Sequence, residues 1–155
     1  MKFKIIIEMF KLHFILTLVV WSKPKLMFNT ADQFRILQLT DFHFGEGVTD
    51  DYNVEGIYNI LSYTNPDLVV VTGDLISGYS YSGGNHFFQD CHEKFVQPFR
   101  DLKIPYVYIL GNHDDEANMN RMEIMMYDSK EEFSYTMEHP FMTTNYFVPI
   151  YDKTG

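Results

Sequence analysis

Three short apolar runs, each stopped by polar residues, constrain the fold of this chain more than any other feature of its sequence. They span residues 34–40, 68–71 and 105–110, and their β-branched and aromatic content is typical of strands. The continuous run at 68–71 favours a strand that is covered on both faces. Helical patterns separate the three runs, and such alternation predicts a mostly parallel sheet with right-handed crossovers. The sequence therefore predicts an α/β fold.

Apolar residues recur at helical spacing in three segments between and after these strands. The spacing predicts helices within residues 54–61, 87–102 and 115–127. Pro98 favours a kink or an early end in the second helix, because proline lacks the N–H that a helix interior needs. Residues 145–151 are compatible with one more strand. Together these segments make successive β-α-β units.

The composition narrows the class of protein. A chain of 155 residues that is 46% hydrophobic can form one domain with a core. Its formal net charge of −9 argues against a nucleic-acid binder, which needs clustered Lys and Arg. A single cysteine, Cys91, excludes an internal disulfide framework, and we expect its thiol to be buried. His86, His92 and His139 have no partner at a metal-ligand spacing, and we expect them to face solvent.

The first part of the chain differs from the rest. Three lysines precede or border an apolar run at residues 12–21, which is too short for a bilayer, since about 20 apolar residues are needed. A basic start, a short apolar run and the small residue Ser22 are typical of a secretory signal. We therefore expect residues 1–22 to be a cleaved signal peptide, and the protein to be secretory, extracellular or vacuolar. An uncleaved anchor and a first buried element of the domain are the alternatives, and without a signal the protein would be cytoplasmic.

Side chains that can bind a metal ion follow each predicted strand. They are Asp41, His43, Asp74, Asn112 and His113. The loops at the carboxyl ends of parallel strands meet at one edge of the sheet, so these residues are expected to lie together. Carboxylate, imidazole and amide ligands suit Mn, Fe or Zn, and two such ions about 3.5–4 Å apart can activate water and neutralise a phosphoryl group. Each residue alone is ordinary in a turn or a helix cap, and only the joint pattern indicates a metal site.

The same residues lie in three motifs that resemble those of the calcineurin-like metallophosphoesterases. The motifs are DxH at residues 41–43, GD at 73–74 and GNHD at 111–114. The wider string, residues 36–121, is most similar to the eukaryotic purple-acid-phosphatase-like branch. The resemblance implies an α/β sandwich of two sheets flanked by helices, of which residues 23–155 would be the N-terminal portion. It also implies hydrolysis of a phosphate-ester substrate at a centre of two divalent metal ions.

The resemblance implies a role for each of these side chains. Asp41 and His43 would bind the first metal ion, Asp74 would bridge both ions, and Asn112 would bind the second. His113 would lie beside the scissile phosphate, where it would stabilise the transition state or protonate the leaving oxygen.

Two further positions bear on this assignment. Asp114 would orient its neighbours rather than react. Position 77 is Ser, where purple enzymes carry a tyrosine ligand and the protein-phosphatase branch carries an aspartate that supports the catalytic histidine. Neither a tyrosinate-coloured iron site nor that histidine–aspartate pairing is therefore expected.

The family completes its metal site with histidines from the second half of the fold, which end in a GHxH motif that does not occur here. We expect the sequence to be part of a longer product, with a degenerate relative as the second alternative. Two functions follow: a metal-dependent phosphoric-ester hydrolase, or a non-catalytic binding module with an incomplete metal site. A third interpretation is that the motifs are ordinary turns of a Rossmann-like domain.

Overall fold

A three-stranded parallel sheet forms the centre of the computed structural model, which describes residues 23–137 and 145–154. Its strands are β2 (Ile36–Leu39), β3 (Leu68–Val71) and β4 (Tyr106–Tyr108), in the order β2-β3-β4. All three strands run parallel, as the alternation of strands and helices predicts. The three short apolar runs are therefore confirmed as neighbouring strands of one sheet.

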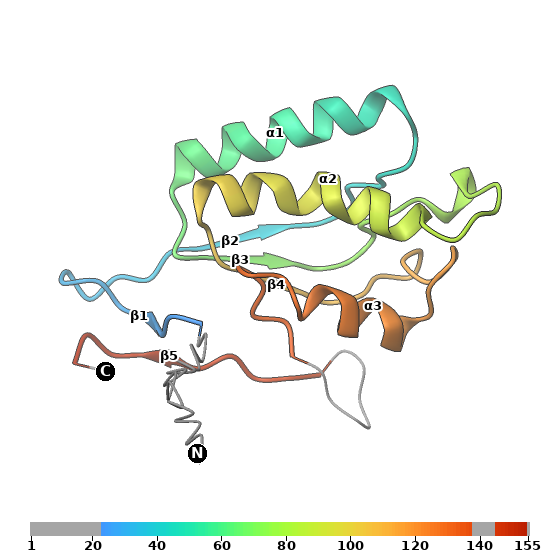
Figure 1. Ribbon diagram of the computed structural model, residues 1–155. Coiled ribbons are helices and arrows are strands. Elements are labelled where there is room, and N and C mark those ends of the chain that lie inside the picture. Colours follow the sequence, from blue (N-terminus) through green and yellow to red (C-terminus); the bar gives the residue numbers. More distant parts are fainter. Residues whose placement is uncertain (1–22, 138–144, 155) are drawn as a thin grey trace, which may run out of the picture.

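Two helices lie against each other over one face of this sheet (Figure 1). They are α1 (Val48–Thr64) and α2 (Phe87–Leu102). α1 begins before the predicted residues 54–61, and two acidic residues in its first turn interact favourably with the helix dipole. α2 continues past Pro98, so the expectation of an early end is wrong. Phe99 lies beyond the proline and packs with its ring centroid 4.7 Å from that of Tyr106, which favours continuation of the helix.

The remaining elements are shorter. A two-stranded parallel sheet joins β1 (Leu26–Met27) to β5 (Ile150–Tyr151), so only the end of the predicted strand at 145–151 forms. One 3₁₀ turn, η1 (Gly78–Ser80), follows β3. α3 (Arg121–Asp128) begins later than expected, because Asn120 and Glu123 form a capping box that fixes its start.

The main hydrophobic core lies between the central sheet and the two covering helices. Aromatic residues dominate the part between α2 and β4, and these are Phe88, Phe95, Phe99, Tyr106 and Tyr108. Cys91 is buried in this core as predicted, and burial raises the pKa of its thiol to about 12. The core therefore joins the sheet to the two helices that cover it.

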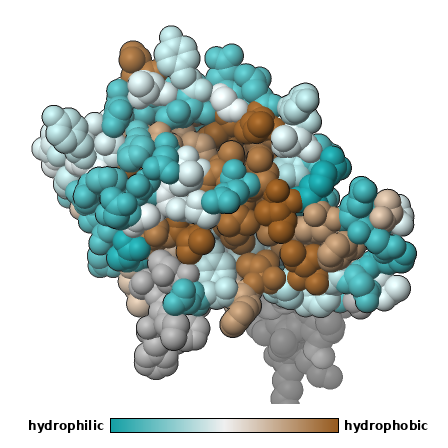
Figure 2. All heavy atoms as spheres, turned by 180° about the vertical axis from the view of Figure 1, so that it is seen from behind, coloured by the Kyte–Doolittle hydropathy of each residue, from teal (hydrophilic) through white to brown (hydrophobic). Residues whose placement is uncertain are grey.

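A second, smaller cluster lies on the opposite face of the sheet, where β1 and β5 lie. It is built around Leu26, Leu68 and Val107. Figure 2 shows the molecule from behind, with apolar side chains gathered in the middle of the view. Ile36 on the edge strand β2 is 56% exposed. This face is therefore less completely covered than the one that carries α1 and α2.

Two expectations concern residues outside the described ranges. The predicted signal peptide, residues 1–22, and His139 both lie there. Among the helices of the described ranges, none has the length and apolar character to cross a membrane.

Candidate metal centre

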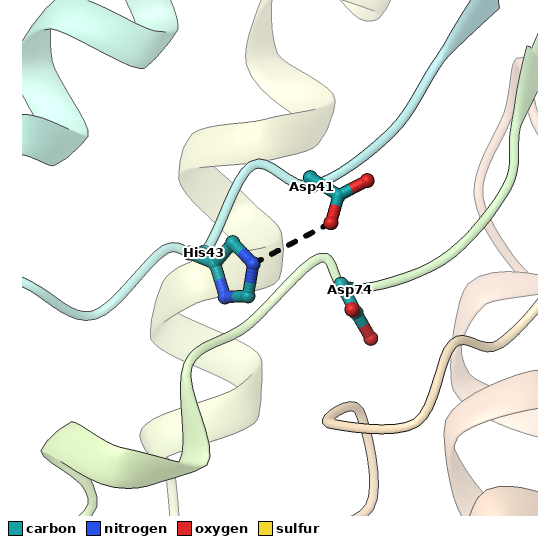
Figure 3. Close-up of side chains that lie close together, drawn as sticks. All are labelled: Asp41, His43 and Asp74. Carbon is teal, nitrogen blue, oxygen red and sulfur yellow. Dashed lines mark ion pairs between the residues drawn. The ribbon is translucent and has the colours of Figure 1, made fainter.

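The loops after β2 and β3 bring three metal-binding side chains together. Asp41, His43 and Asp74 each offer one ligand atom, and these atoms lie within 4.8 Å of one another. Figure 3 shows Asp41 and His43 turned toward each other, with Asp74 on the adjacent loop. The distance from His43 Nε2 to Asp41 Oδ1 is 3.7 Å. We call these three residues the strand-end cluster, and their two carboxylates and one imidazole fit a divalent ion of the Mn, Fe or Zn type.

All three members of the strand-end cluster have a left-handed backbone. The φ angles are 58° at Asp41, 49° at His43 and 53° at Asp74. Residues other than glycine adopt this conformation at a cost of about 1–3 kcal/mol, and they concentrate at functional sites. Asp32, Asn65 and Lys103 share the conformation, but Asp32 lies at the turn after β1, and Asn65 and Lys103 terminate α1 and α2, where a left-handed residue is ordinary. Asp and His adopt this conformation more readily than most residues, but the concentration of three such residues in one place points to a site where side-chain direction matters.

Two glycines let the loops after β3 and β4 touch. Gly73 has φ 102°, and a Cβ built on it would overlap the backbone nitrogen of Gly111. A Cβ on Gly111 would in turn overlap Oδ1 of Asp74. Because side chains are excluded at both positions, the GD and GNHD segments pack backbone to backbone. The backbone N–H of His113 then donates a hydrogen bond of 3.0 Å to Asp74 Oδ1.

Asp114 fastens these two loops together. Its side chain is buried, and Oδ2 accepts hydrogen bonds from the backbone N–H of Asp74 at 3.0 Å and of Gly111 at 2.6 Å. Oδ1 accepts a third bond, of 2.7 Å, from Leu75 N–H. Asp114 therefore holds the backbone on both sides of the crossing. Both of its oxygens are occupied by backbone N–H groups, so Asp114 is not counted in the strand-end cluster.

His113 and Asn112 lie in the same loop at the border of the strand-end cluster. The ring of His113 has its centroid 5.7 Å from that of His43. Its Nδ1 lies 2.8 Å from Oε2 of Glu116, and this hydrogen bond raises the pKa of His113. Asn112 is exposed beside it. The five residues that the motifs single out thus come from three neighbouring loops at one edge of the sheet.

Sequence reasoning placed one histidine in the wrong environment. His92 is buried, with Nε2 2.8 Å from Asp128 Oδ1, so the expectation that it faces solvent is wrong. It lies on the same stripe of α2 as the buried Phe88 and Phe95, and that spacing was a signal for burial. Sequence reasoning also missed Glu116, which no motif contains.

Comparisons with known proteins agree with the motifs and the sheet. Residues 34–153 match the family described as calcineurin-like phosphoesterase. "Probable inactive purple acid phosphatase 28" of Arabidopsis thaliana is 29% identical over 132 residues, which cover 76% of this chain and 32% of that protein. "Probable inactive purple acid phosphatase 29" of the same plant is 31% identical, over 67% of this chain and 30% of its own length.

A yeast relative extends the comparison beyond plants. "Phosphatase DCR2" of Saccharomyces cerevisiae is 29% identical over 78% of this chain and 24% of its own length. No solved structure matches the chain. The chain spans about a third or less of the length of these curated relatives. Because the family match covers most of the sequence and includes all three strand-end motifs, this chain belongs to the calcineurin-like phosphoesterase family.

Proposed function

We propose that this chain carries part of the active site of a metal-dependent phosphoric-ester hydrolase. The observation that supports the proposal most directly is the convergence of Asp41, His43 and Asp74, each with a strained left-handed backbone. Strain at three ligand-type residues in one place is retained when side-chain direction matters more than stability. Family membership supplies the reaction class, since related proteins are named phosphatases.

The side chains of the site can supply ligands for the two divalent metal ions that this activity needs. Asp41 and His43 would hold one divalent ion, Asp74 would contribute to both, and Asn112 would contribute to the second. Mn, Fe and Zn all fit carboxylate, imidazole and amide ligands. When bound, such ions supply Lewis acidity toward a phosphoryl oxygen and lower the pKa of water.

The protein's own groups position these ligands and the substrate. Asp114 holds the backbone of Asp74, so that the Asp74 carboxylate is directed before any ligand arrives. The ring of His113, at the border of the strand-end cluster, would donate a hydrogen bond or a proton to the phosphate ester. Its backbone bond to Asp74 fixes the distance between the acid and the ligand.

A non-catalytic binding module is the second candidate. Both plant relatives named above carry the words "probable inactive" in their names, and Ser77 replaces the residue types expected there in active branches. Such a module would bind metal ions weakly or at one site only. The two candidates therefore differ in a property that can be measured without a substrate.

Titration calorimetry of the metal-free natural protein that contains this chain, with Mn²⁺ and Zn²⁺, separates them. The hydrolase proposal expects two tight sites, and it expects Asp74→Asn to weaken both because Asp74 is the shared ligand. In the natural protein that contains this chain, Asp74→Asn should lower hydrolysis of para-nitrophenyl phosphate more than about 100-fold. Asp32→Asn, which removes an exposed carboxylate paired with Lys153, is the matched control and should leave both readouts unchanged. Undiminished turnover in Asp74→Asn would contradict the proposal.

A further inference from the structure

A carboxylate outside every motif contacts the candidate acid His113. Oε2 of Glu116 lies 2.8 Å from Nδ1 of His113, within hydrogen-bond range. The backbone turn supports the pair, because Glu116 N–H donates to the carbonyl of His113 at 3.2 Å. The partner of one imidazole nitrogen determines which nitrogen carries the proton. Nδ1–H therefore points to Glu116, and Nε2 is left for other contacts.

The loop after β3 leaves space for Glu116 at a specific position. A Cβ built on Gly78 would overlap Cβ of Glu116 and approach its Oε2 to 2.6 Å. The preceding residue, Ser77, is buried, and its backbone N–H is bonded to Phe44 O. Position 77 therefore offers no carboxylate to His113, and Gly78 lets one arrive from the β4 loop instead.

The other two acidic residues of this loop are occupied elsewhere, Asp114 by backbone N–H groups and Asp115 by Arg121. Asp115 Oδ1 lies 3.0 Å from Nη1 of Arg121, and the same Nη1 donates a 2.9 Å bond to Gly111 O. Arg121 thus holds the loop through Gly111, and the Asp115 carboxylate is paired with Arg121 rather than with His113. Among the acidic residues of the loop, Glu116 is the one within hydrogen-bond distance of the His113 ring.

We propose that Glu116 is a positioning residue that holds His113 through Nδ1–H, so that in the protonated ring Nε2–H is the donor presented to a phosphate ester at the strand-end cluster. The identity of the substrate, a phosphate ester, rests on the proposed function. The contact between Glu116 and His113 rests on geometry alone. Glu116 and His113 are both partly exposed, so the pair adds little to stability, as is usual for surface ion pairs. Its consequence is the orientation and tautomer of the ring.

The tautomer of His113 tests the inference without metal or substrate. Long-range ¹H–¹⁵N spectra of the metal-free chain, labelled at histidine and recorded at a pH where the ring is neutral, report which nitrogen carries the proton. Wild type should show the Nδ1–H form, and Glu116→Ala should lose that preference. Gly78→Ala should have the same effect, because the added methyl group displaces the Glu116 side chain. Glu132→Ala, which removes an exposed glutamate from another segment, is the control and should match wild type.

The kinetic readout separates positioning from metal binding. In the natural protein, Glu116→Ala should lower kcat for para-nitrophenyl phosphate about 10-fold, with KM and the Mn²⁺ titration unchanged. An Nε2–H form in wild type, or an unchanged tautomer in Glu116→Ala, would overturn the inference. Loss of metal binding in Glu116→Ala would overturn it as well, since Glu116 would then be a ligand. The proposed function fails if Asp74→Asn keeps full hydrolytic activity. That result would say nothing about which nitrogen of His113 carries the proton, so the two failures are distinguishable.

Discussion

Two histidine–aspartate pairs in this chain lie in opposite environments. His43 and Asp41 are 3.7 Å apart at the end of β2, with side chains 35% and 58% exposed. His92 and Asp128 are 2.8 Å apart between α2 and α3, with side chains 1% and 0% exposed. The same two residue types thus form an open group that can accept a ligand and a buried group in which both carboxylate oxygens of Asp128 already have partners, although His92 Nδ1 has none among the described residues. Environment, more than residue type, separates a candidate site from a structural contact.

The buried pair is part of a hydrogen-bonded network. Asp128 Oδ1 accepts a bond of 2.7 Å from the hydroxyl of Tyr106, and Oδ2 accepts one of 2.7 Å from Ser134 Oγ. The Nζ of Lys23 donates to the carbonyl of Ser134, so the network reaches the start of the described chain. Because α2, α3 and β4 all contribute, the network joins elements that are distant in sequence. A buried charge surrounded by donors is costly to disturb.

The largest expected effect comes from breaking this network. Asp128→Asn should lower the free energy of unfolding by about 3–5 kcal/mol, because it removes the charge that His92, Tyr106 and Ser134 contact. Urea unfolding followed by circular dichroism measures the change. Asp32→Asn breaks an exposed pair with Lys153 and should cost at most about 1 kcal/mol. Equal losses in the two variants would contradict the structural role assigned to the buried pair.

Local sequence patterns are enough to predict the central sheet, and they fail where distant segments decide the structure. β3 is predictable because its apolar run is short for a helix and contains three valines, which favour a strand. β1 and β5 are two-residue strands from opposite ends of the chain, and segments so short carry no periodicity. Pro98 is tolerated in α2 because apolar residues on both sides of it pack on the sheet, which helix propensity alone does not reveal.

The candidate site also has a part that the local sequence predicts and a part that it does not. Asp41, His43, Asp74 and the GNHD segment are predictable, because parallel strands bring their carboxyl ends together. The roles assigned to these residues stay predictions until metal binding is measured. Glu116 could not be predicted, since its contact with His113 depends on the space above Gly78 on another loop. The position of His92 on the apolar stripe of α2 indicated burial, but its partner, Asp128, lies on a different helix and could not be predicted.

An intermediate effect is expected from relieving strain in the strand-end cluster. His43→Gly should raise the free energy of unfolding by about 1 kcal/mol. Glycine adopts a positive φ without the strain of about 1–3 kcal/mol. Part of this gain is lost because glycine gives up more backbone entropy on folding. The same variant should weaken Mn²⁺ binding in calorimetry. Lys103→Gly, at φ 56°, is the matched control. It should stabilise to a similar extent and leave metal binding unchanged, whereas destabilisation by His43→Gly would show that the cluster contributes to folding.

The smallest expected effect is the response of the buried pair to acid. Burial raises the pKa of Asp128, but the hydrogen bond and charge of His92, with further hydroxyl donors, outweigh it and leave the pKa below the ordinary value of 3.8. A carboxylate whose pKa is lowered by folding contributes stability above its unfolded pKa and loses it as the pH falls through the folded value.

Wild type should therefore lose free energy of unfolding as the pH falls below about 3.8, and Asp128→Asn should lack that part of the loss. The gap between the two proteins should narrow in urea unfolding series between about pH 6 and pH 2.5. Asp32→Asn controls for removal of one negative charge from the surface. A constant gap would mean that Asp128 stabilises the fold by its shape and hydrogen bonds alone. A narrowing gap would mean that the charge of Asp128 is the stabilising feature. The two histidine–aspartate pairs would then differ in what their charges do, because the buried pair supports the fold and the exposed pair is left free to bind a ligand.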